Sequence, residues 1–192
     1  MDEEQTFVDA AKSGDLDAAD TLIRRYQVRI FNFARTLTAN YEDAEDLAQE
    51  TFVREFRGMA GFRGEASFKN WLYTIATNVA RSDFGKRARQ APVWDRRLEA
   101  DDVPEHQLNS PMESVEDSVM RRQMVDRALA TLSEELRVTL VLHDVEGLEY
   151  REIASVLDIP VGTVMSRIFR ARRRLRPVLT ELQAPHLGEV AL

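Results

Sequence analysis

The sequence predicts an all-α protein built from two small helical domains that a flexible acidic linker joins. Its 192 residues include only eight glycines and six prolines, and apolar residues recur at the three- and four-residue spacing of amphipathic helices. No stretch alternates apolar and polar residues convincingly as a β-strand would. Residues 92–118 lose this periodicity and carry too little apolar surface to fold alone, so they separate the two domains. We expect domains at 1–91 and 119–182 and a tail at 183–192.

The first domain is expected to contain helices over 16–38, about 44–57, and from 68 to about 89. The first helix has one buried apolar stripe, formed by Leu22, Ile23, Tyr26, Ile30, Phe33, Ala34 and Leu37. The apolar pattern of the second is Leu47, Ala48, Thr51, Phe52 and Phe56. Its remaining surface carries Glu45, Asp46, Gln49, Glu50 and Glu55. Gly58 and Gly61 break this helix before a short loop.

The second domain has the pattern of a helix-turn-helix. Helices over 119–132 and 133–143 come first, and Ser133 is a good N-cap for the latter. Two more helices, 150–157 and 161–175, are joined by a turn with a proline, which cannot continue one helix but suits the start of the next. The residues expected to pack this pair of helices are Ile153, Ala154, Leu157 and Val164.

Charge is segregated along the chain, so the net charge of −7 alone misleads. Residues 42–50 carry five acids and no base, 99–117 carry seven acids and no base, and 167–176 carry six arginines and no acid. The arginines would repel one another without a polyanion, which favours DNA binding over a solvated helical hairpin. The absence of cysteine and the scatter of three histidines argue against a metal site or cofactor.

No apolar run is long enough for a membrane span, and the acidic N-terminus is unlike a secretory signal, so we expect a cytoplasmic protein without membrane insertion. The loop at 62–68 and the helix after it mix aromatic and basic residues, as single-stranded DNA binding requires. For Trp71, packing in the core is an equal alternative. The acidic helix at 43–56 is either a solvated face or a protein-binding surface, and no base or nucleophile beside it indicates catalysis.

At these residues the chain resembles the sigma-70 family, and within it the short extracytoplasmic-function (ECF) sigma factors, which keep only the second and fourth conserved domains. Residues 43–52, DAEDLAQETF, resemble the helix that binds core RNA polymerase on the clamp helices of its largest subunit. Residues 62–78 resemble the segment that melts DNA and reads the minus-10 element, and 161–172 are similar to the minus-35-reading helix. The family threads its acidic linker through basic channels of the polymerase.

The resemblance implies three groups of site residues. Those for core polymerase are Asp43, Asp46, Leu47, Gln49, Glu50, Phe52 and Val53. Those for the minus-10 element and single-stranded DNA are Phe62, Arg63, Gly64, Ser67, Phe68, Lys69, Trp71, Tyr73, Asn78 and Arg81. Those for the minus-35 element are His143, Thr163, Met165, Ser166, Arg167, Phe169, Arg170 and Arg173. Met165 and His143 depart from relatives, which often carry a basic residue and in some cases an arginine there.

The implied activity is that of a non-enzymatic subunit that directs polymerase to promoters and helps open them. Its implied partners are the β and β′ subunits of core RNA polymerase, promoter DNA and an anti-sigma factor. An alternative from another class is a stand-alone helix-turn-helix regulator, which would bind an operator without polymerase. An enzyme with a DNA-binding tail would need a catalytic constellation, and the sequence indicates none.

Overall fold

The computed structural model describes residues 3–38, 40–90 and 124–183, and within these ranges all regular structure is helical. The all-α prediction is confirmed. The acidic linker predicted at 92–118 and the tail lie outside the described residues, apart from residue 183, and the boundaries between domains stay a prediction.

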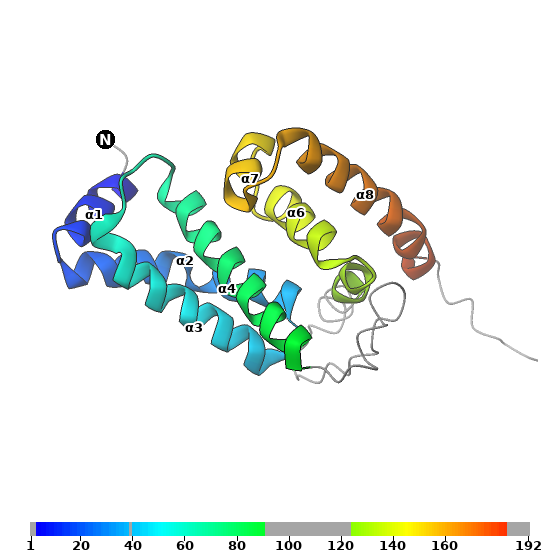
Figure 1. Ribbon diagram of the computed structural model, residues 1–192, viewed down its shortest axis with the longest axis horizontal. Coiled ribbons are helices and arrows are strands. Elements are labelled where there is room, and N and C mark those ends of the chain that lie inside the picture. Colours follow the sequence, from blue (N-terminus) through cyan, green and yellow to red (C-terminus); the bar gives the residue numbers. More distant parts are fainter. Residues whose placement is uncertain (1–2, 39, 91–123, 184–192) are drawn as a thin grey trace, which may run out of the picture.

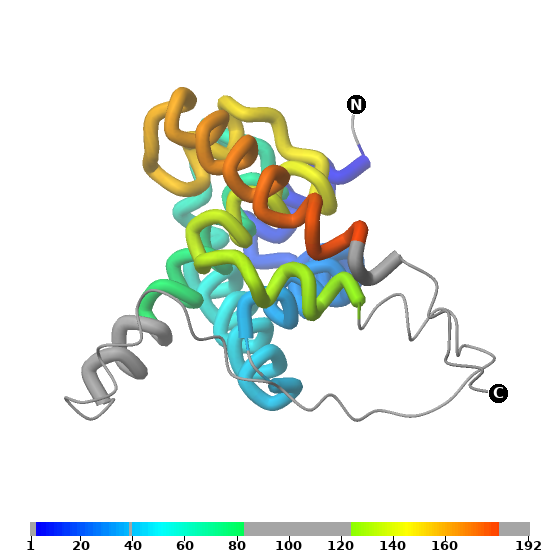
Figure 2. The backbone as a smooth tube through the Cα atoms, turned by 90° about the vertical axis from the view of Figure 1, so that its right-hand side faces the viewer, coloured from blue at the N-terminus to red at the C-terminus, as the bar shows by residue number. Residues whose placement is uncertain are grey.

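Two groups of helices lie side by side (Figure 1). The N-terminal bundle comprises α1 (Glu3–Lys12), α2 (Leu16–Leu37), α3 (Tyr41–Gly58), the 3-10 turn η1 (Met59–Gly61) and α4 (Phe68–Gln90). The C-terminal bundle comprises a short helix at 124–130, then α6 (Glu134–Asp144), α7 (Tyr150–Leu157) and α8 (Val161–Gln183). Figure 2, turned by 90°, shows α6 and α8 in front of the N-terminal bundle.

Side chains at the helix ends explain where several helices begin. The Asp15 carboxylate accepts hydrogen bonds from the backbone N–H groups of Asp17 and Ala18, which starts α2. Helix α7 begins with a capping box between Glu149 and Glu152. Ser133 stands at the N-cap of α6, as predicted, but its side chain makes no capping hydrogen bond. These caps satisfy backbone donors that a helix leaves free at its N-terminus.

The core of the N-terminal bundle follows the predicted stripe of α2 but differs from the prediction on α3. Glu55 was expected at the surface and is only 1% exposed, whereas Phe56, expected in the apolar face, is 53% exposed. The reason is the helical angle: Glu55 follows buried Thr51 by four residues and buried Ala44 by eleven, so all three share one side. Helix α1, with Val8 and Ala11 buried, was not predicted from the sequence.

The helix-turn-helix is confirmed in the C-terminal bundle. Ile153, Leu157 and Val164 are buried between α7 and the neighbouring helices. Asp158 ends α7 in the left-handed conformation with φ 53°, and the Pro160 carbonyl accepts the first hydrogen bonds of α8. Helix α8 runs beyond the predicted end at residue 175, through Pro177.

The two bundles contact each other through α7 against α4 and α6 against α2. This contact places segments more than 70 residues apart in sequence next to one another, and it was not predicted. None of the helices in the described residues is long and apolar enough to cross a membrane.

Candidate DNA and protein interfaces

Helix α8 presents a line of exposed side chains to solvent. Met165, Phe169 and Arg173 follow one another at four-residue spacing, and the first two are 53% and 69% exposed. Ser166 and Arg170 are exposed next to this line. The exposed phenylalanine and methionine, with arginines beside them, suit the apolar base edges and phosphates of a DNA groove. All five residues were predicted as minus-35 contacts, and the structure brings them together.

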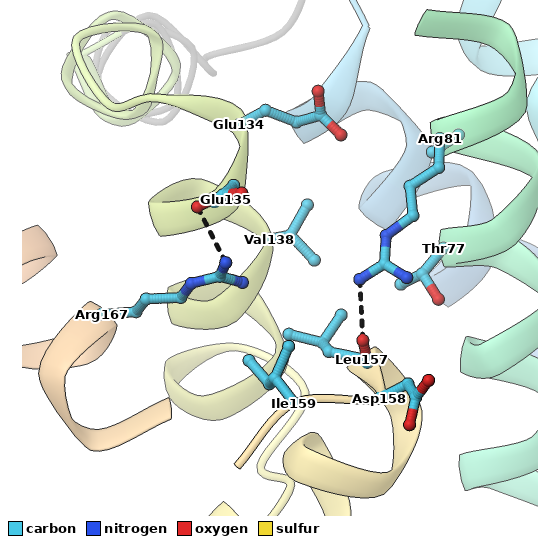
Figure 3. A pocket seen from close by; sticks show the side chains of 10 residues that line it. Thr77, Arg81, Glu134, Glu135, Val138, Leu157, Asp158, Ile159 and Arg167 are labelled. Carbon is cyan, nitrogen blue, oxygen red and sulfur yellow. Dashed lines mark hydrogen bonds and ion pairs between the residues drawn. The ribbon is translucent and has the colours of Figure 1, made fainter. Parts of the chain in front are cut away.

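Arg167 was assigned to the same surface and instead lies on another side of α8. It follows Met165 by two residues, which turns it about 200° around the helix axis. Its side chain is 13% exposed and its guanidinium lies 2.8 Å from a carboxylate oxygen of Glu135 on α6 (Figure 3). The assignment of Arg167 to DNA reading is therefore not supported by its position here: its cation is held within the C-terminal bundle.

The cavity beside Arg167 has a volume of about 380 Å³ and lies between the two bundles. Thr77, Ala80 and Arg81 of α4 form one wall, and residues of α6 and the α7–α8 turn form the others (Figure 3). Burial raises the pKa of Glu134, which lines this cavity.

The two remaining residues predicted to contact the minus-35 element, Thr163 and His143, are not part of the exposed line on α8. Thr163 is half-buried in the first turn of α8. His143 is held by its own bundle: its Nδ1 lies 2.9 Å from the Leu148 carbonyl oxygen, and its ring packs on Tyr150 at 4.8 Å between centroids. These contacts fix the orientation of the imidazole within the C-terminal bundle.

The aromatic residues predicted to stack on single-stranded DNA are mostly core residues. Phe62, Phe68 and Tyr73 are all buried. Phe62 stacks on Trp71 with 4.7 Å between ring centroids, and Tyr73 packs edge-on against Phe33 at 5.3 Å. The aromatic composition that indicated base stacking thus serves packing for these three rings, because their faces are covered by protein.

The remaining residues of that group lie on the loop and on two different sides of α4. Arg63 is 84% exposed, Gly64 has φ +73°, and the Ser67 hydroxyl oxygen accepts a hydrogen bond from the N–H of Asn70. Asn78 is exposed on the side of α4 that also holds the half-buried Trp71. Lys69 and Arg81, about 120° apart around the helix axis, both donate hydrogen bonds to the C-terminal bundle.

Helix α3 carries the residues predicted to bind polymerase, and they differ in exposure. Asp46, Gln49 and Val53 are exposed, whereas Leu47 is 3% exposed and belongs to the core, so it cannot present its side chain to a partner in this structure. The half-buried members are Asp43, Glu50 and Phe52.

A groove of about 330 Å³ runs between α2 and α3 next to these residues. Gln49 and Phe52 line it from α3. The α2 side, which the sequence analysis did not assign to a site, contributes Ile23, Gln27, Val28 and Phe31. In the sequence, Val28 could have indicated this groove, because it is an apolar residue on the polar side of α2. In the structure it is 63% exposed.

No group of three histidine, cysteine or acidic residues that could hold a metal ion occurs in the described part of the chain. The features that remain are an arginine-rich helix-turn-helix and an apolar groove on a second helical bundle. This combination defines a two-bundle DNA-binding protein that also offers a surface for a protein partner.

Two parts of the chain match models of known protein families. Residues 22–90 match the family model of Sigma-70 region 2, and residues 122–175 match that of Sigma-70 region 4. The chain belongs to the sigma-70 family of transcription initiation factors, and its relatives place it among the ECF sigma factors.

Two relatives illustrate the match. The RNA polymerase sigma-H factor of Pseudomonas aeruginosa is 37% identical, over 94% of this chain and 98% of that protein. The ECF RNA polymerase sigma-E factor of Escherichia coli K12 is 35% identical, over 90% of this chain and 92% of that protein.

Solved structures of similar fold include two sigma complexes. The sigma factor RpoE in complex with the anti-sigma factor NepR from Bartonella quintana has a TM-score of 0.66 and 27% identity, covering 84% of this chain and 96% of that chain. CnrH in complex with the cytosolic domain of CnrY has a TM-score of 0.69 at 24% identity, covering 94% of this chain and 99% of that chain, and it supports the fold alone.

Proposed function

We propose that this chain is a non-enzymatic ECF sigma subunit that binds core RNA polymerase and inserts α8 into the major groove of the minus-35 element. The observation that carries this proposal is the exposed line on α8. A helix-turn-helix reads base edges with side chains from the N-terminal part of its second helix, where Met165, Ser166 and Phe169 stand. Arg170 and Arg173 lie along the same surface and are suited to the flanking phosphates.

In the proposed mechanism, the N-terminal bundle binds the melted non-template strand of the minus-10 element. Support comes from the exposed Arg63 on the loop and the exposed Asn78 on α4. Cations follow the strand's backbone, and an amide can pair with an unstacked base. The buried rings of Phe62, Phe68 and Tyr73 would support this surface from beneath.

The groove between α2 and α3 is the proposed docking site for core polymerase. Gln49 and Phe52 line it, and the exposed Asp46 adds a negative charge next to it. An apolar groove with an acidic rim suits an amphipathic partner helix with basic residues. Once polymerase holds both bundles, two weak DNA contacts act as one bivalent contact. An acidic chain would then bind promoters strongly only with its partner.

An anti-sigma factor is a further proposed partner. RpoE of Bartonella quintana, in its complex with NepR, superimposes on 84% of this chain, an extent that includes both bundles. The similarity supports an anti-sigma factor as a partner of this chain.

The test is run-off transcription from a genomic promoter library with purified core polymerase, with and without the full chain, alongside DNA binding by the chain alone. We expect promoter-specific transcripts only when both proteins are present. Tight sequence-specific binding without core, and no transcripts with it, would overturn the proposal in favour of a stand-alone regulator.

Matched variants separate the two interfaces. Arg173→Ala should reduce transcription from the best promoter on the order of tenfold, the loss of about one good DNA contact. Arg174→Ala removes the same charge from exposed α8, about 100° further around the helix, and should change transcription far less.

For the polymerase surface, Asp46→Arg should weaken binding of the chain to core. The control Asp9→Arg makes the same charge change on exposed α1, away from the groove. Equal core affinity of the two variants would remove α3 from the proposed interface.

A further inference from the structure

Several polar contacts join the two bundles. On one side of the interface, Arg137 of α6 donates to the Thr36 carbonyl oxygen at 3.2 Å, and Arg35 lies 3.6 Å from the Asp126 carboxylate. On the other side, the Asn70 amide donates to the Glu152 carboxylate at 2.7 Å. Interfaces between domains of one chain are more polar than obligate interfaces, and relative motion of the domains is the default expectation for them.

Glu146 of the C-terminal bundle contacts two basic residues of the N-terminal bundle. It stands between α6 and α7, and its side chain is 5% exposed. The Arg29 guanidinium on α2 donates to one Glu146 carboxylate oxygen from two nitrogens, at 2.9 and 3.2 Å. The Lys69 ammonium on α4 donates to the Glu146 backbone carbonyl oxygen. A carboxylate this deeply buried needs its cation, because a buried charge without a partner is strongly destabilising.

We propose that the ion pair between Arg29 and Glu146 is the latch of a closed state of the free chain, in which the C-terminal bundle covers one side of α4. Both partners of this ion pair are residues of the chain itself. Opening would return the Glu146 carboxylate and the two cations to water, where each is well solvated.

The closed state has a consequence for DNA that rests on the function proposed above. Two cations assigned to single-stranded DNA are occupied in it: Lys69 by Glu146, and Arg81 by the Leu157 carbonyl oxygen at 2.9 Å. The exposed line of α8 stays accessible. Closure therefore withdraws charge from the minus-10 surface and leaves the minus-35 surface free.

The absence of native cysteine allows a clean distance measurement. Ala60 of η1 and Ser155 of α7 are both exposed, small and in different bundles, so Ala60→Cys and Ser155→Cys accept a spin-label pair with little perturbation. Pulsed electron–electron double resonance on the labelled full chain should give one narrow distribution of distances between the two spin labels at low salt. A broad distribution already for the parent chain would overturn the proposal.

In this background, Glu146→Gln should lower the ratio of closed to open molecules by about tenfold, since it removes the charge of a buried carboxylate that pairs with a half-exposed cation. Asp144→Asn is the matched control: it removes the same charge two residues away, where the carboxylate pairs with Arg172 of its own bundle. Arg29→Met should act like Glu146→Gln, and the double variant should be no more open than either single variant. Circular dichroism checks that each variant retains its helices.

Binding of a fluorescent single-stranded oligonucleotide tests the consequence separately. We expect Glu146→Gln to raise its affinity several-fold over that of Asp144→Asn. Opening without a gain in affinity would overturn the masking of Lys69 and Arg81, but not the latch. An unchanged distance distribution in Glu146→Gln would overturn the latch, whatever the chain does with polymerase.

Discussion

The buried carboxyl group of Glu55 should make the stability of the protein fall as pH rises. Its side chain is 1% exposed and neither carboxylate oxygen has a hydrogen-bond partner in the structure. Burial raises its pKa from 4.5 to about 7. The folded state then holds this proton more tightly than the unfolded state. Stability is therefore full below the unfolded pKa of 4.5 and is lost as pH rises through the folded pKa near 7. A pKa shift of this size lowers the free energy of unfolding by about 3 kcal/mol above pH 8, relative to its value at low pH.

Glu55→Met tests this reasoning, because methionine keeps the length of the side chain and removes its charge. Urea unfolding followed by circular dichroism should show the variant more stable than the parent, by about 2 to 3 kcal/mol more at pH 8.5 than at pH 5. Glu45→Met, at an exposed position of the same helix, should show no such growth of the difference. The argument would be refuted if the difference in free energy of unfolding between variant and parent were the same at both pH values, or if the variant were less stable than the parent at pH 8.5.

Three other predictions concern stability and are checked by thermal or urea unfolding. Asp15→Ala should lose about 1 kcal/mol, since it removes the acceptor for two backbone N–H groups, and Asp15→Asn should retain most of the stability. Leu72→Ala should lose about 2 to 5 kcal/mol by leaving a cavity at a fully buried position. Gly14→Ala should destabilise by about 1 kcal/mol because φ is +95°, whereas Gly162→Ala, in the first turn of α8 with open space around it, should be neutral or stabilising.

Local patterns in the sequence predicted most of the helices but not every residue's side of its helix. The apolar periods of α2 and α7 were strong, and the turn chemistry before α8 placed its start at Val161. The predicted burial of Glu55 and Phe56 was wrong because residue type was given more weight than position around the helix. The glutamate was expected to be exposed, although it lies on the same side of α3 as Ala44 and Thr51. Tertiary packing decided against the expectation drawn from residue type.

The site could be predicted only where its residues are close in sequence. The α8 line depends on one helix, and its spacing is visible in the chain. The side of α8 on which Arg167 lies follows from the same spacing, but its ion pair depends on Glu135 of another helix, and the contacts of Lys69 depend on Glu146, 77 residues away. No periodicity encodes such pairings, so the sequence could assign a cation to DNA but not show that the protein itself already holds it.

The stacking of Trp71 on Phe62 gives the protein a built-in optical reporter. The indole is fixed by that ring, and its Cζ2 lies 3.1 Å from where a side chain on Gly58 would begin, so it senses both the end of α3 and the loop before α4. The chain has only two tryptophans, and the other, Trp94, lies outside the described residues. In a Trp94→Phe background, the emission of a single residue would follow, without any added dye, how this loop responds when polymerase or single-stranded DNA is added.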